Sequence, residues 1–91
     1  MKVNIRGITH EVIELESGFD ADAHFGQIDY LDTRIKINKT MSPGLKESTI
    51  THEMLHGILM HCGYDELAND ERFVRTIGNA IFQGFNVRII D

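Results

Sequence analysis

The chain contains the stretch Thr51-His52-Glu53-Met54-Leu55-His56, which holds the pattern H-E-x-x-H within a segment whose sequence predicts a helix. Residues four apart on a helix lie on one face, so His52 and His56 can offer two imidazoles to one metal ion. Glu53 then lies next to that ion without being needed as a ligand. Zinc hydrolases use this pattern, with the glutamate as the general base.

The sequence on either side predicts where this helix begins and ends. Ser42 suits the N-cap, Pro43 the first helical position and Gly63 the residue after the end, so we expect a helix over residues 43–62. A second helix should begin near Asn69 or Asp70. Its apolar stripe has helical spacing and consists of Phe73, Val74, Ile77, Ala80, Ile81 and Phe85.

The first 42 residues predict strands. Residues 2–6 alternate, and residues 10–16 fit either a strand or a helix, with Val12 and Ile13 favouring a strand. A turn and loop should follow over residues 17–24, then a hairpin of residues 25–30 and 33–38, and residues 86–91 read as an extended tail. The prediction is one α+β domain over residues 1–91, a minimal zincin-like fold. In it, an antiparallel sheet of three or four strands packs on the metal-binding helix and a second, C-terminal helix.

Composition narrows the classes of function. The 91 residues carry a net charge of −5 with no basic cluster, which argues against a nucleic-acid partner. No apolar run approaches the roughly 20 residues of a membrane span, and the first residues do not resemble a signal peptide. The single cysteine, Cys62, cannot form an internal disulfide. We therefore expect a cytoplasmic protein.

A hydrolytic zinc site has three protein ligands and one open position, so a third ligand is needed besides the two histidines. Glu71 is favoured, because it lies in the first turn of the second helix and has the longer reach. Asp70 is an alternative, although an acidic residue there also suits a helix N-terminus. His61 and Cys62 are further candidates, but both lie well round the first helix from the two histidines.

Over residues 26–85 the chain resembles the small phage- and prophage-encoded relatives of the ImmA/IrrE metallopeptidases, which are minimal zincins. The resemblance rests on residues 26–30 (Gly-Gln-Ile-Asp-Tyr), 34–38 (Arg-Ile-Lys-Ile-Asn), 41–43 (Met-Ser-Pro), 48–59, 63–64, 71–74 and 78–83. It implies that His52, His56 and Glu71 are zinc ligands and that Glu53 is the catalytic acid and base. The typical substrates of that family are repressor proteins. We expect the chain to differ from larger members in lacking an accessory domain and a long loop around a cleft.

Three functions are compatible with these patterns. The first is a zinc-dependent metallopeptidase that hydrolyses a peptide or protein segment through a metal-activated water. The second is an inactive zincin-fold module that binds a phage or host regulator. The third is a structural zinc domain closed by Cys62 or His61. For the first, residues 33–38 could be the sheet edge that receives a peptide, and Tyr64 and His61 could stabilise the oxyanion.

Overall fold

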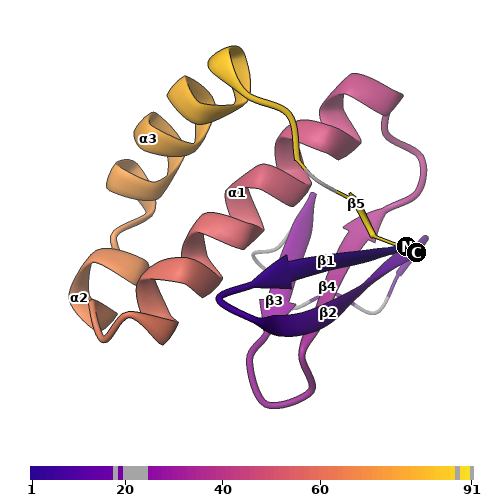
Figure 1. The fold of residues 1–91 in the computed structure, drawn as a ribbon. Helices are drawn as coiled ribbons and strands as arrows, with labels where there is room; N and C mark the ends of the chain where they lie inside the picture. Colours follow the sequence, from indigo (N-terminus) through magenta and orange to yellow (C-terminus); the bar gives the residue numbers. More distant parts are fainter. Residues whose placement is uncertain (18, 20–24, 88, 91) are drawn as a thin grey trace.

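The computed structural model describes residues 1–17, 19, 25–87 and 89–90 (Figure 1). Its strands are β1 (Lys2–Ile5), β2 (Ile8–Leu15), β3 (Gly26–Asp29), β4 (Arg34–Asn38) and β5 (Ile89–Ile90). Its helices are α1 (Pro43–His61), α2 (Asp65–Ala68) and α3 (Glu71–Gly84). The predicted α+β class and the four longer strands are confirmed. The expected loop at residues 20–24 lies outside the described residues.

The sheet differs from the prediction in size and direction. Its five strands have the order β3-β4-β2-β1-β5, and β2 pairs with β4 in parallel whereas the other neighbours are antiparallel. The predicted all-antiparallel sheet of three or four strands was therefore wrong. β4 lies inside the sheet between β3 and β2, so the expectation that residues 33–38 form an edge was also wrong. β3 is the edge strand on that side.

The core lies between the sheet and α1. Its buried side chains come from the three strands β1, β2 and β4 and from one face of α1: Val3, Ile5, Val12, Ile35, Ile37 and Ile50. α1 lies between the sheet and α3, which runs back across it (Figure 1). Burying this apolar surface is the main source of stability in so small a chain. None of the described helices has the length and apolar content needed to cross a bilayer.

The predicted boundaries of α1 are confirmed to within one residue. The Ser42 hydroxyl accepts a hydrogen bond from the Leu45 amide at 3.3 Å, and Pro43 opens the helix. Gly63 follows the C-cap with a φ of +85°, which glycine adopts without the steric cost of a side chain. These two ends fix where His52 and His56 stand along the helix.

α3 packs on α1 through a narrower face than the sequence predicted. Val74 and Gly78 are buried, whereas Ile77 and Phe85 are exposed. A Cβ atom on Gly78 would lie 3.7 Å from the Cα of His52, so the two backbones cross closely there. This crossing brings the start of α3 towards the histidine face of α1.

β3 covers one buried stripe of α1, formed by Thr49, Glu53 and Gly57 at four-residue spacing. A Cβ atom on Gly26 would lie 2.7 Å from Cγ2 of Thr49. A Cβ atom on Gly57 would lie 2.9 Å from Cδ1 of Ile28. Glu53 stands between these two contacts, so β3 lies over it. We call these three residues the β3-facing stripe.

Replacing Gly26 with alanine should destabilise the fold by about 1–3 kcal/mol. The new methyl group would lie 2.8 Å from the Lys36 carbonyl oxygen, which is backbone and cannot move aside alone. Gly44→Ala is the matched control, because a Cβ atom there meets nothing within 4 Å. Urea unfolding gives both free energies; equal stability of the two variants would show that β3 does not approach α1 this closely.

Candidate metal centre

The structure brings together His52, His56 and Glu71, the three residues that the sequence selected first. Nε2 of His52 lies 2.6 Å from Oε1 of Glu71, and Nε2 of His56 lies 3.1 Å from Oε2. The two histidine nitrogens are 3.2 Å apart. One ligand atom from each residue lies within 4.8 Å of the other two, so the group could hold a metal ion.

α2 fixes the orientation of the His56 ring through the nitrogen that does not face the candidate ligands. Its Nδ1 lies 2.6 Å from the carbonyl oxygen of Ala68, the last residue of α2 and fully buried. A carbonyl can only accept, so Nδ1 carries a proton and donates it to Ala68, and Nε2 is the nitrogen that faces Glu71 and His52 and could bind a metal. Metal-binding histidines are commonly oriented through their other nitrogen in this way. The short helix α2, which the sequence did not predict, supplies this contact.

His52 favours the unprotonated form that a metal requires. Burial lowers its pKa, and the charge of His56 acts in the same direction, while the carboxylate of Glu71 opposes both. Three groups bearing lone pairs thus meet at one point. Such an arrangement is favourable only when a proton or a metal cation lies among them.

Asp70 and Glu71 have different positions although they are neighbours. The Asp70 carboxylate is the N-cap of α3 and accepts a hydrogen bond from the Phe73 amide at 3.1 Å. That bond sets the first turn of α3 so that Glu71 points to the histidines. Asp70 therefore stabilises the N-terminus of α3, the role that its position in the sequence also suited, and is not one of the three candidate ligands.

His61 and Cys62 do not join the group either. The ring of His61 packs edge-on against His10, with centroids 5.8 Å apart, and its Nε2 is buried without a hydrogen-bond partner. Cys62 is exposed at the end of α1. Within the described part of the chain no fourth side chain completes the group. The geometry thus gives no support to a structural zinc site closed by either residue.

Glu53 is buried beside the candidate ligands, and only 7% of its surface is exposed. Its burial, and next the negative charge of Glu71, raises the pKa of its carboxyl from 4.5 to about 8. In the metal-free protein the carboxyl therefore holds a proton at neutral pH. A positive ion among His52, His56 and Glu71 would favour the carboxylate instead.

The raised pKa of Glu53 predicts how stability changes with pH in the metal-free protein. Between pH 4.5 and about 8 the folded state binds more protons at this carboxyl than the unfolded chain does, so this contribution to stability falls as pH rises. Glu53→Gln replaces the carboxyl with an amide that does not titrate, so this loss of stability with rising pH disappears. In the presence of a chelator, the free energy of unfolding of the variant should increase relative to that of wild type as pH rises, by on the order of 3 kcal/mol at pH 8.

Urea unfolding of both proteins at pH 5 and pH 8 measures this difference. Comparing the two proteins at each pH cancels the contributions of the other titrating groups. A constant difference across this range would contradict the burial of an ionisable carboxyl at Glu53.

Tyr30 is a residue near the centre that sequence reasoning missed. It follows β3 directly and is half-buried. Burial first, and then the negative charges of Glu53, Asp65 and Glu71, raises the pKa of its phenol. The two donors proposed from the sequence lie elsewhere, because Tyr64 is 59% exposed and Nε2 of His61 is buried near His10. The one available signal was the place of Tyr30 at the end of a predicted strand.

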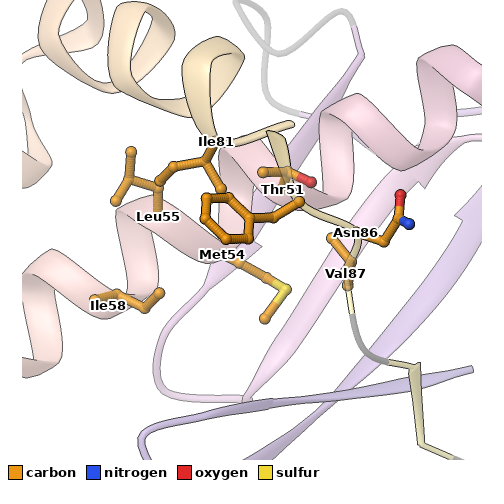
Figure 2. Close-up of a pocket in the computed structure, with 8 residues that line it drawn as sticks. Thr51, Met54, Leu55, Ile58, Ile81, Asn86 and Val87 are labelled. Carbon is orange, nitrogen blue, oxygen red and sulfur yellow. The ribbon is translucent and has the colours of Figure 1, made fainter. Parts of the chain in front are cut away.

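A separate apolar pocket of about 190 Å³ lies between α1, the end of α3 and residues 85–87. Figure 2 shows Leu55, Ile58 and Ile81 around it, with Asn86 at one side. None of the candidate ligands lines it, and neither does Glu53. The pocket is therefore distinct from the candidate metal centre.

Comparison with known proteins identified no relative of this chain. Scans against protein-family models, curated proteins and solved structures each found no match.

Proposed function

We propose that the chain is a zinc-dependent metallopeptidase of the H-E-x-x-H type, related to the phage and prophage ImmA/IrrE metallopeptidases. The observation that carries the proposal is the convergence of His52, His56 and Glu71 beside a buried Glu53. Two histidines and one carboxylate leave a fourth position free for water or substrate, as in catalytic zinc sites.

The donor set suits zinc, and so does the spacing of its two histidines. Ligands held tetrahedrally at about 2.0–2.1 Å from a zinc ion are about 3.3 Å apart. The two histidine nitrogens here are separated by 3.2 Å. A zinc ion at this position would supply Lewis acidity, lowering the pKa of a water molecule and polarising a carbonyl group.

Glu53 has the position of a general base. It is next to His52 in sequence and lies on the sheet side of the histidines, under β3. Its carboxylate oxygen would take the proton from the attacking water and deliver it to the nitrogen of the broken peptide bond. The water oxygen bonds to the carbonyl carbon, and the C–N bond breaks to give an acid and an amine.

The substrate fits best as an extended segment of a peptide or protein. Among the described strands β3 has a neighbour on one side only, and it is the strand that lies over Glu53. An extended chain could pair with this edge and so pass the candidate ligands. The partner we propose is a repressor-type regulator in the cytoplasm. The free, exposed Cys62 of the present chain is compatible with a reducing compartment.

The test uses zinc-loaded protein and a mixture of randomised decapeptides, with products identified by mass spectrometry. We expect new peptide ends that form only with zinc, disappear with a chelator and return when zinc is added back. Full zinc loading without any cleavage would overturn the peptidase and favour a module that acts by binding.

A further inference from the structure

The phenol of Tyr30 is a polar group near the centre to which the proposed mechanism gives no role. β3 runs over the β3-facing stripe of α1, with Gly26 next to Thr49 and Ile28 against Gly57. Tyr30 lies two residues beyond Ile28, where the strand passes into the loop towards β4. It therefore stands at the end of the edge strand, beyond the point where β3 passes Gly57.

The surroundings of Tyr30 come from three helices. The carboxylates that act on its phenol are Glu53 of α1, Asp65 of α2 and Glu71 of α3. One of these is the candidate base and another a candidate ligand, so the phenol lies within electrostatic range of the metal centre. Burial and these charges raise the pKa of the phenol, which keeps its proton available for donation.

We propose that the Tyr30 hydroxyl is a catalytic group that donates a hydrogen bond to the carbonyl oxygen of the scissile peptide bond as that oxygen gains negative charge. The inference rests on the proposed peptidase function. Attack on a carbonyl places charge on its oxygen, and a preorganised donor is the usual way to stabilise it. A peptide paired along β3 would present its carbonyl near the end of that strand.

Other donors are less well placed. Tyr64 is exposed, and Nε2 of His61 is buried near His10. Arg75 acts on His52 from α3, which does not contact the edge strand closely, and its side chain is exposed. Tyr30 is the donor on the same side as Glu53 and the free sheet edge.

Tyr30→Phe tests the inference, with Tyr64→Phe as the matched control, since these are the two tyrosines of the chain. Both changes remove one hydroxyl and keep the ring. With the best-cleaved decapeptide, we expect Tyr30→Phe to lower kcat by about 10²- to 10³-fold while KM changes little. Tyr64→Phe should leave both unchanged, and both variants should bind zinc as wild type does.

A second measurement does not depend on turnover. A phosphinic analogue of the same decapeptide mimics the charged tetrahedral centre, and its affinity for the zinc-loaded protein can be measured by calorimetry. We expect Tyr30→Phe to weaken its binding by about 10- to 100-fold, and Tyr64→Phe to leave it unchanged.

The outcomes separate the two proposals. If wild type cleaves peptides and Tyr30→Phe keeps both kcat and the analogue affinity, the role of Tyr30 is wrong and the peptidase stands. If Tyr30→Phe loses zinc, the phenol supports the metal centre and the proposed contact with substrate is again wrong. If zinc-loaded wild type cleaves nothing, the peptidase itself fails, and the role of Tyr30 fails with it.

Discussion

Glu53→Gln should strongly reduce peptide hydrolysis while leaving the bound zinc in place. Glutamine has nearly the shape of glutamate but cannot take a proton from water, so the step that makes the nucleophile loses its base. We expect kcat to fall by about 10²- to 10⁴-fold. Because Glu53 is adjacent to the candidate ligands but not among them, zinc content and affinity should remain close to wild type.

Glu11→Gln is the control for this change. Glu11 is an exposed glutamate on β2, and it lies outside the group of candidate ligands. It should retain full activity. Equal activity of Glu53→Gln and wild type would remove the hydrolytic mechanism, and a biological effect that survives Glu53→Gln would favour the binding module over the enzyme.

His56→Ala and Glu71→Gln should each weaken zinc binding well beyond about 100-fold, because removing even an outer partner of a ligand costs about 10- to 100-fold. His56 offers one lone pair to the site and is oriented by Ala68, so no neighbouring side chain replaces it. Glu71 contributes the carboxylate that meets both histidines. Loss of its charge removes the anionic member of the group.

Zinc loss should also appear as reduced stability. A ligand that binds only the folded state at 100 times its Kd adds about 2.7 kcal/mol to the free energy of unfolding. A chelator should therefore lower the melting temperature of wild type and leave that of His56→Ala unchanged. A chelator effect of equal size in both proteins would point to a metal bound elsewhere.

Much of the candidate site could be predicted because its signals are local. The four-residue spacing of His52 and His56 needs only the helix period, and Ser42, Pro43 and Gly63 mark that helix by cap chemistry that acts over a few residues. The hairpin of β3 and β4 also follows from alternation around a short turn. The role of Glu71 depended on a tertiary contact, and the sequence could only rank it above its competitors.

The features that were missed depend on contacts between distant segments. Alternation is the same in parallel and antiparallel strands, so nothing in residues 8–15 indicates that β2 pairs in parallel with β4. β5 has two residues and α2 has four, too few to produce a periodic pattern. The place of Tyr30 at the end of the outer strand follows from the strand order, which is decided by the whole sheet.

The most direct test is the zinc content of purified protein after zinc addition and dialysis, compared between wild type, Glu71→Gln and Asp70→Asn. Asparagine is a good N-cap, so Asp70→Asn keeps the start of α3 while removing the neighbouring carboxylate. The account predicts about one zinc per chain in wild type and in Asp70→Asn, and almost none in Glu71→Gln. A wild type without zinc, or a Glu71→Gln variant that keeps it, would contradict the proposed metal centre.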